Sequence, residues 1–165
     1  MSVEPIAAPM ATPQVEPLVD PADPDWLRLR QSLWPDTPAD EHLEEMAACA
    51  GQPRRCGQFI ARLPTDRRAV GFAEAALRTD YVNGTDSSPV AFLEGLYVSP
   101  EVRRQGISKA LVAAVARWAR AQGCTELASD TPLDNVTSQR VHERLGLAET
   151  ERVVYFNMPL GDGHR

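Results

Sequence analysis

The sequence has few cysteines, few aromatic residues and no long apolar run, and these shortages exclude several classes of protein. Its three cysteines, Cys49, Cys56 and Cys124, are odd in number and form no Cys-x-x-Cys pair, which argues against a disulfide framework and a zinc site. No stretch approaches the roughly 18 apolar residues of a membrane-spanning helix, and no signal peptide is evident. We therefore predict a cytoplasmic protein with reduced thiols, no metal and no membrane partner.

Basic residues are also in the minority. The 17 lysines and arginines stand against 23 acidic residues, which leaves a formal net charge of −6. Binding to a nucleic-acid backbone normally needs a basic face, so we predict no nucleic-acid partner. An excess of carboxylates suits a cationic ligand better.

The chain of 165 residues is long enough for one sizeable core and too short for a second domain. We predict a disordered Ala/Pro-rich extension over 1–13, a single domain over 14–160 and a flexible tail over 161–165. In chain order, the expected elements are a strand at 14–18, helices at 21–33 and 38–50, strands at 56–63, 69–77 and 92–98, a helix at 108–122, a strand at 125–129, a helix at 135–145, and a closing hairpin or long strand at 147–158. This order predicts a mixed α/β sheet with helices on both faces.

The stretch 94–108 is the most informative, because it predicts a buried strand, a turn rich in backbone donors and the start of a helix. Pro100 ends the strand, and apolar residues recur at helical spacing from Lys109. Gly106 allows the backbone N–H groups of the turn to converge on an anion, which the helix dipole also favours. The spacing alone is equally compatible with an ordinary loop carrying two solvated arginines.

The turn resembles the acetyl-CoA loop of the GNAT superfamily of acyl-CoA N-acyltransferases. The family pattern Arg/Gln-x-x-Gly-x-Gly/Ala is matched by Arg103, Gly106 and, less closely, Ser108. The resemblance implies the GNAT fold, a mostly antiparallel sheet splayed into a V, and acetyl-CoA whose pantetheine arm pairs with a free strand edge. The implied donor-site residues are Leu96, Tyr97, Val98, Arg103, Arg104, Gln105, Gly106, Ile107, Ser108, Lys109 and Asn135.

Downstream of the loop, Asn135, Ser138 and His142 occupy positions where the family usually has Asn, a small residue and Tyr. Asn135 would bind the pantetheine arm, with helix N-capping as its alternative role. The family's tyrosine commonly protonates the leaving thiolate, and His142 could donate a proton near neutral pH. The alternative for His142 is to fill space between helix and sheet.

Six other segments resemble the bacterial aminoglycoside 6′-N-acetyltransferases: 33–35, 80–84, 87–90, 92–95, 128–130 and 149–153. By that resemblance, the substrate-binding residues are Trp34, Tyr81, Glu94, Asp130 and Glu151. A sheltered charge-assisted hydrogen bond contributes roughly 1.5–3 kcal/mol and an exposed ion pair about 0–1 kcal/mol, so sheltered acids would dominate affinity for a polycationic drug. Glu94 interrupts an apolar strand, which implies a cationic partner, either the ligand or an arginine such as Arg78. Trp34 and Tyr81 as core residues, and Asp130 as a turn residue, are the alternatives.

The implied reaction is direct attack of the 6′-amine on the thioester in a ternary complex, without a cysteine nucleophile. Asp130 is the expected base for the ammonium, whose pKa as a free alkylamine is about 10.4, and Glu94 is the second choice. A backbone N–H near Leu96 or Tyr97 would hold the oxyanion. Two alternatives stay open. One is acetylation of another amine, such as a polyamine or a protein terminus, and the other is a non-catalytic acetyl-CoA or drug-binding role.

The related enzymes commonly form homodimers by exchanging the closing strand. Residues 153–158 are therefore an expected interface element.

Overall fold

The structure, a computed structural model, describes residues 12–160. The predicted extension over 1–13 and tail over 161–165 lie almost wholly outside the described residues, and their boundaries stay predictions. The elements, in chain order, are β1 (Gln14–Pro17), α1 (Pro24–Leu33), α2 (Ala39–Ala50), β2 (Cys56–Arg62), β3 (Ala69–Arg78), β4 (Val90–Val98), a 3-10 turn (Pro100–Val102), α3 (Ile107–Ala121), β5 (Leu127–Ala128) and α4 (Val136–Arg144).

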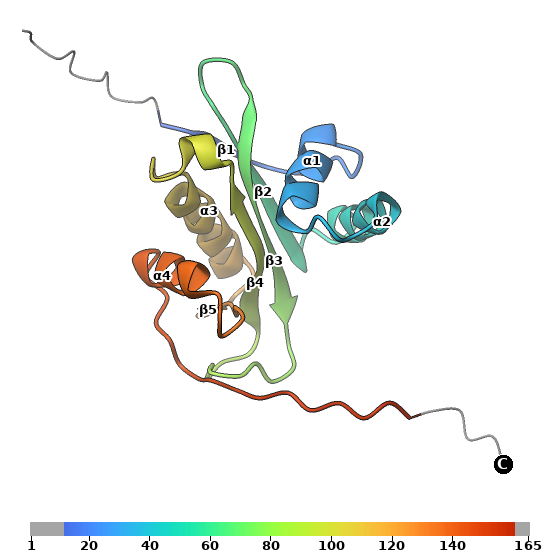
Figure 1. Ribbon diagram of the computed structural model, residues 1–165, viewed down its shortest axis with the longest axis vertical. Helices are drawn as coiled ribbons and strands as arrows, with labels where there is room; N and C mark the ends of the chain where they lie inside the picture. The colour runs from blue at the N-terminus through green and yellow to red at the C-terminus, as the bar shows by residue number, and fades with distance from the viewer. Residues whose placement is uncertain (1–11, 161–165) are drawn as a thin grey trace, which may run out of the picture.

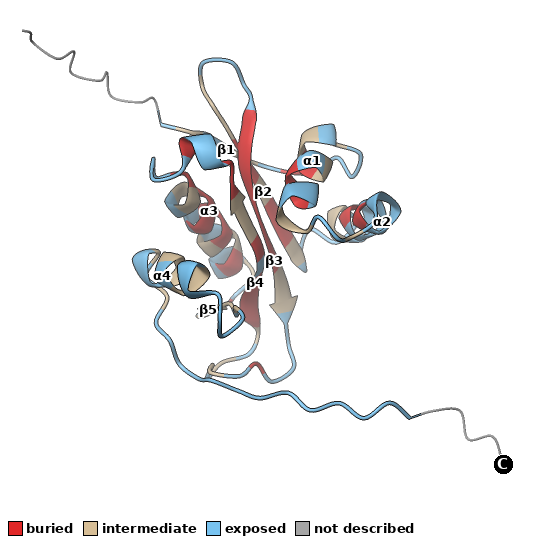
Figure 2. Cartoon of the chain, in the orientation of Figure 1, coloured by how far each residue is buried: buried red, intermediate tan, exposed pale blue. Residues whose placement is uncertain are grey.

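The strands form one mixed sheet in the order β1-β2-β3-β4-β5, in which β4 and β5 are parallel and the other neighbours are antiparallel. One face is covered by α1 and α2 and the other by α3, while α4 lies beside the β5 end (Figure 1). Buried residues concentrate in β2, β3 and β4 and on the sides of the helices that face them (Figure 2). The predicted α/β sheet with helices on both faces is confirmed.

A buried ion pair fixes α1 to the sheet. The Glu74 carboxylate on β3 accepts hydrogen bonds from Trp26 Nε1 and Arg30 Nη1, each at 2.5 Å. Arg30 also donates to His42 Nδ1 on α2 at 3.2 Å and pairs with Glu45. Burial raises the pKa of the Glu74 carboxyl, and the Arg30 guanidinium opposes that shift. The cluster therefore joins two helices to a central strand through one carboxylate.

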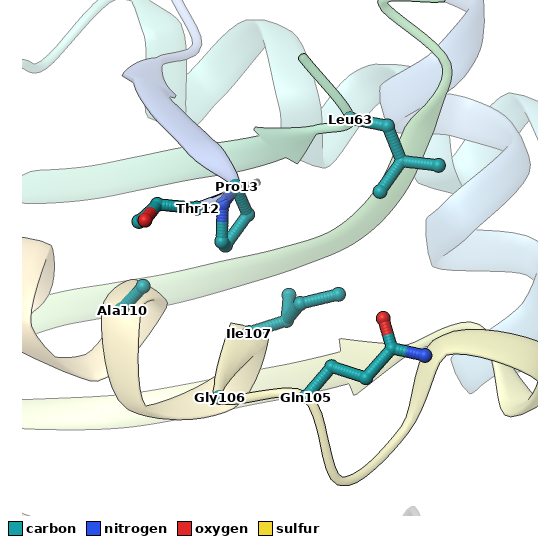
Figure 3. A pocket seen from close by; sticks show the side chains of 7 residues that line it. All are labelled: Thr12, Pro13, Leu63, Gln105, Gly106, Ile107 and Ala110. Atoms are coloured by element: carbon teal, nitrogen blue, oxygen red, sulfur yellow. The ribbon is translucent and has the colours of Figure 1, made fainter. Parts of the chain in front are cut away.

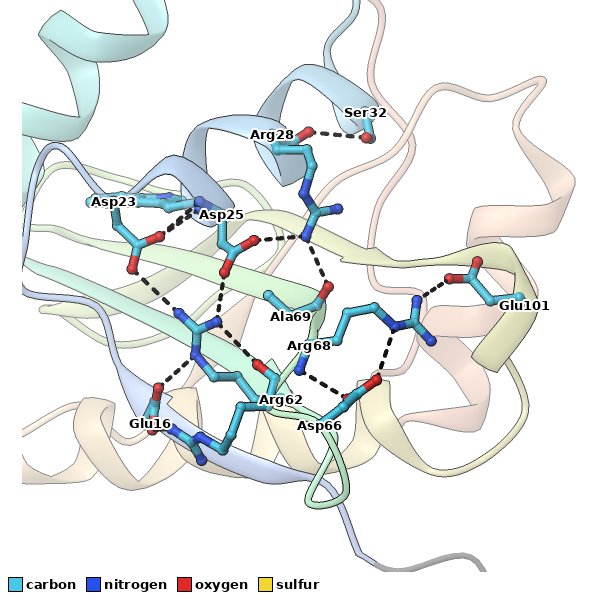
Figure 4. A network of polar contacts seen from close by, with 12 residues as sticks. Glu16, Asp23, Asp25, Arg28, Ser32, Arg62, Asp66, Arg68, Ala69 and Glu101 are labelled. Carbon is cyan, nitrogen blue, oxygen red and sulfur yellow. Dashed lines mark hydrogen bonds and ion pairs between the residues drawn. The ribbon is translucent and has the colours of Figure 1, made fainter.

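A second network, centred on Arg62, holds the edge strand β1 (Figure 4). Arg62 donates to Glu16 at 2.8 Å and to Asp25 at 2.7 Å, and lies 3.4 Å from Asp23. Burial acts to raise the pKa of the Asp25 carboxyl. The Arg62 guanidinium outweighs burial and lowers that pKa below its usual value. The side chain of Asp23 also caps α1 by accepting from the N–H groups of Asp25 and Trp26, which is why the helix begins later than predicted.

The expected closing hairpin or long strand at 147–158 is wrong for this chain alone. Residues 148–160 have no regular structure and are exposed, including large apolar side chains: Val153, Val154, Tyr155, Phe156, Met158 and Leu160. A strand is stable only where another strand accepts its backbone hydrogen bonds, and this segment runs away from the sheet (Figure 1).

Smaller differences concern the ends of elements. The strand expected at 125–129 contains only Leu127 and Ala128, and Pro38 is the N-cap of α2 without a side-chain cap hydrogen bond. No helix among residues 12–160 is long and apolar enough to cross a membrane.

Candidate active site

The turn between the 3-10 turn and α3 has the backbone of an anion site. Gly106 is the N-cap of α3 at φ +81°, and Arg104 also has a positive φ of 65°. The first hydrogen bond at this end runs from the Ala110 N–H to the Gly106 carbonyl, so the N–H groups of 107–109 are not used within the helix. The first turn of α3 contains no acidic residue that would repel an anion.

The arginines of this turn differ in their contacts. Arg103 Nε donates to the backbone oxygen of Val98 at 2.9 Å, which ties the turn to the end of β4. Arg104, Gln105 and Lys109 are exposed. Arg103 is exposed as well, so both arginines meet solvent, but Arg103 is also tied to β4 by this hydrogen bond.

A small recess lies behind the turn (Figure 3). It has a volume of about 200 Å³ and is lined by Thr12, Pro13, Leu63, Gln105, Gly106, Ile107 and Ala110. Thr12 and Pro13 precede β1, which is at the opposite edge of the sheet from β5. The other side of the recess is formed by Gln105, Gly106 and Ile107, which belong to the predicted donor site.

The free strand edge predicted for the pantetheine arm is present on β4. Pairing with β5 is limited to Ala91 with Leu127 and Phe92 with Ala128. Beyond Phe92, β4 pairs with β3 on one side and with no strand of the described residues on the other. This separation forms the V and leaves the edge at Leu96–Val98 open to an added chain.

Glu94 lies in a β-bulge. Glu74 on β3 pairs with Gly95 and Ala75 pairs with Leu93, so Glu94 has no partner residue on β3. Its carboxylate is exposed and accepts from Arg78 Nη2 at 2.9 and 3.1 Å. The bulge therefore leaves this side chain at the surface, although its neighbours in β4 are buried. Of the two expected partners, Arg78 is the one present.

Trp34 packs over the same bulge. A Cβ atom at Gly95 would lie 2.5 Å from the Trp34 ring, so glycine at this position allows the indole to contact β4. The ring also packs edge-on against Phe72, with centroids 6.0 Å apart, and is half-buried. Trp34 is thus partly a core residue, and the rest of its ring is exposed for ligand contact at the bulge.

Tyr81 belongs to the loop between β3 and β4 and is 79% exposed, which excludes the core alternative for this residue. The neighbouring Asn83 Nδ2 lies 3.5 Å from Glu151 Oε2, so the loop meets the beginning of the C-terminal segment. The Glu126 carboxylate, just before β5, accepts from the Ser87 N–H at 2.7 Å and holds the loop from the other side. The Ser87 hydroxyl also donates to Glu126 and lowers the pKa of that carboxyl.

Asp130 is exposed and comes directly after Ser129, whose Oγ donates to the backbone oxygen of Leu93 at 3.1 Å. This hydrogen bond joins the residues that precede Asp130 and Glu94. Trp34 and Glu94 therefore lie at the bulge, and Asp130 follows the serine that contacts Leu93 there. Tyr81 lies in the β3–β4 loop, which Glu151 meets at Asn83.

Asn135 has the N-cap role that was its alternative, because its Oδ1 accepts from the Ser138 N–H at 3.0 Å. Its amide nitrogen is left for the cofactor contact that the resemblance implies. His142, half-buried, makes hydrogen-bond contacts at both ring nitrogens, so it does more than fill space.

Ser129 and Glu126 connect the parts of this site, although the sequence patterns did not predict a role for either. Ser129 lies inside a matched segment, and the sequence around Glu126 carries no signal of its contact with the distant loop.

The model of the acetyltransferase (GNAT) family matches residues 24–147. The chain belongs to the GNAT family. The splayed sheet is therefore the GNAT fold, as the resemblance implied.

Within this GNAT family, the chain is similar to proteins that are each called aminoglycoside N(6′)-acetyltransferase type 1. The protein of Serratia marcescens is 52% identical over 136 residues, which cover 82% of this chain and 92% of that protein. The protein of Klebsiella aerogenes is 42% identical over 151 residues, which cover 91% and 99% of the two chains.

Among solved GNAT structures, AAC(6′)-Iy in complex with the bisubstrate analog CoA-S-monomethyl-acetylneamine has a TM-score of 0.84 and 44% identity, covering 90% of this chain and 99% of that chain. AAC(6′)-Ih from Acinetobacter baumannii also has a TM-score of 0.84, with 46% identity and coverage of 91% and 100%. The family match over 24–147 includes the turn before α3, the bulge and the β3–β4 loop.

Proposed function

We propose that this GNAT chain transfers the acetyl group of acetyl-CoA to the 6′-amine of aminoglycoside antibiotics and thereby inactivates them. The observation that carries the proposal is the placement of Trp34, Glu94 and Asp130 around the β4 bulge, next to a free edge and a donor loop. Similarity to aminoglycoside N(6′)-acetyltransferases over most of the chain supports the choice of acceptor.

Acetyl-CoA is held by two kinds of backbone contact. Its pantetheine arm pairs with β4 at Leu96–Val98, and its pyrophosphate binds the N–H groups of the donor loop, residues 103–109. The side chains of Arg104 and Lys109 add positive charge, and the amide nitrogen of Asn135 donates to the arm. Free cysteine thiols suit a reducing compartment, and we place the reaction in the cytoplasm.

The aminoglycoside is recognised through its ammonium groups and sugar rings. Glu94 and Asp130 attract the ring that carries the 6′-amine, while Trp34 packs against it. Tyr81 and Glu151 contact a more distant ring, because Glu151 meets the β3–β4 loop that carries Tyr81 at Asn83. Arg78 neutralises Glu94 before the drug binds and is displaced or shared when it does.

The transfer is direct, without an acetylated cysteine. Burial and contact with Cys56 raise the pKa of Cys49 to about 12, and burial also raises the pKa of the Cys124 thiol. Neither thiol supplies a thiolate nucleophile near neutral pH. Asp130 instead removes a proton from the 6′-ammonium, directly or through water, and the free amine attacks the thioester carbon.

The first experiment follows thiol release from acetyl-CoA with kanamycin and locates the acetyl group by NMR. We expect modification at the 6′-amine, and Asp130→Asn should lower kcat by about 100-fold or more, since general base catalysis contributes about 10²–10⁴. Glu94→Gln, the matched change, should mainly raise KM for the drug. Acetylation elsewhere would contradict the acceptor assignment, and loss of kcat in Glu94→Gln alone would move the base to Glu94.

We also propose that the enzyme is a homodimer in which the C-terminal segment of each protomer adds to the sheet of its partner. The outer edge of β5 is unpaired among the described residues, and the segment is exposed with Tyr155 79% and Phe156 93% accessible. When two protomers exchange these segments, the backbone of each segment can pair with the free β5 edge of the other protomer.

Tyr155→Lys combined with Phe156→Lys should convert the dimer to a monomer in light scattering after gel filtration. Val19→Lys is the control, because Val19 is another exposed apolar residue, 77% accessible, far from this segment in sequence. A dimer that survives the double change would contradict the exchange.

A further inference from the structure

We infer that Ser129 and His142 form a proton relay where β4 and β5 separate, with the Ser129 hydroxyl as the group that meets the reacting atoms. The inference rests on the proposed acetyl transfer and adds Ser129 to its catalytic residues. Four polar groups from three parts of the chain carry it: the Ser138 carbonyl, the His142 ring, the Ser129 hydroxyl and the Leu93 carbonyl.

The His142 imidazole is held at both nitrogens. Its Nδ1 lies 2.8 Å from the backbone oxygen of Ser138, one turn earlier on α4, and its Nε2 lies 3.0 Å from Ser129 Oγ. Ser129 Oγ lies 3.1 Å from the backbone oxygen of Leu93 on β4. These contacts form a continuous line of hydrogen bonds from α4 to β4 across the base of the V.

The carbonyl of Ser138 determines which nitrogen carries the proton. A carbonyl oxygen can only accept, so Nδ1 donates to it, and Nε2 of the neutral ring presents a lone pair. The single proton of the Ser129 hydroxyl can turn from the Leu93 carbonyl to this lone pair, because both lie within hydrogen-bond distance of Oγ. In this state, the serine oxygen has its own lone pairs free to accept a proton from a substrate.

The same atoms also accommodate a protonated ring. When His142 is an imidazolium, Nε2–H donates to Ser129 Oγ, and the serine proton rotates to the Leu93 carbonyl at 3.1 Å. The contact between Ser129 and His142 is kept in both protonation states, whereas the Leu93 carbonyl accepts the serine proton only when the ring is protonated. A proton can therefore enter and leave through Ser129 without breaking the attachment of α4 to the sheet.

The location fits the reaction. Ser129 directly precedes Asp130, the proposed base, and its hydroxyl contacts Leu93, which directly precedes Glu94. The proposed donor edge begins at Leu96. The Ser129 hydroxyl thus lies where the segments that carry Asp130, Glu94 and the donor edge meet, and both Ser129 and His142 are half-buried.

The relay moves one proton from nitrogen to sulfur. After Asp130 has removed the first proton, the amine bonds to the thioester carbon, leaving a positively charged nitrogen and a negatively charged oxygen. Ser129 Oγ takes one N–H proton and passes its own to His142 Nε2. As the C–S bond breaks, its electron pair goes to sulfur, the carbonyl re-forms, and the imidazolium returns the proton through Ser129 to the thiolate. Amide and CoA thiol leave, and both residues regain their starting states.

The test compares Ser129→Ala with Ser129→Thr and with Ser32→Ala. Ser129→Ala should lower kcat about 100-fold or more with both KM values within about twofold, whereas threonine, which keeps the hydroxyl, should restore most of the rate. Ser32→Ala removes a hydroxyl that donates to the Arg28 carbonyl at 3.0 Å, and should leave the rate unchanged. A merely structural role for Ser129 would instead raise KM or lower the melting temperature.

A relay acts as a unit, so His142→Phe should match Ser129→Ala, and the double variant should be no slower than either single one. Multiplied losses, or an unchanged kcat in Ser129→Ala, would overturn the inference. Thiol release is measured with kanamycin and with a simple primary amine in parallel. If only the simple amine is acetylated, the proposed acceptor fails, and the same variants then test the relay with that amine.

Discussion

Arg30→Leu should lower the free energy of unfolding by about 3–5 kcal/mol, the usual cost of removing one partner of a buried ion pair. The Arg30 side chain is 4% exposed and the Glu74 side chain 9%, so the remaining carboxylate would be left desolvated with only the Trp26 indole as a partner. Leucine fills part of the volume but supplies no charge. Urea denaturation followed by circular dichroism measures the difference.

Arg28→Leu is the matched control on the same helix. Arg28 pairs with Asp25 at 3.0 Å, but its side chain is 50% exposed, so its loss should cost only about 0–1 kcal/mol. Equal losses in the two variants would contradict a special role for the buried pair. Arg30→Leu combined with Glu74→Leu should recover part of the stability, because it removes the unpaired carboxylate as well.

The stability of Arg30→Leu should also depend on pH with a defined sign. Burial already raises the pKa of Glu74, and removal of Arg30 takes away a group that opposes the shift. A carboxyl whose pKa is higher in the folded state favours folding at low pH and loses that contribution as pH rises. The destabilisation should therefore be smaller at about pH 5 than at about pH 8.

The order of elements was predictable because each has a local pattern that agrees with its surroundings. In α3, for example, Ile107, Leu111 and Val115 are buried at helical spacing, and the turn before it requires the positive φ that Gly106 supplies. Family motifs then predicted where a donor loop and the substrate-binding acidic residues lie on this frame.

Two features of the site depend on partners that the local sequence does not reveal. Glu94 is at the surface because β4 has one residue more than β3 at that point, and such a bulge follows from how two strands align. Ser129 and Glu126 gain their roles from contacts with Leu93 and with the β3–β4 loop. The closing segment contains a run of strand-favouring residues, Val153–Phe156, but within one chain it has no regular structure.

Gly106→Val should raise KM for acetyl-CoA about tenfold or more, while Gly123→Val should not. The two glycines flank α3 at φ +81° and +85°, and a Cβ atom at either position would meet nothing within 4 Å. Each substitution therefore costs only backbone strain, about 1–3 kcal/mol for a branched residue at positive φ. Both variants should lose similar stability.

The two valine variants differ in which ligand contacts depend on the strained backbone. At Gly106, relief of strain rotates the N–H groups of the donor loop away from the pyrophosphate, and about 1.4 kcal/mol of lost contact is a factor of ten in affinity. At Gly123, the same relief affects only the end of α3 remote from that loop. Calorimetric titration with CoA, beside thermal melts, separates the two effects.

Gly106→Asn should keep most of the affinity, because asparagine tolerates positive φ. Equal CoA affinity in Gly106→Val and Gly123→Val would show that the turn does not bind the pyrophosphate.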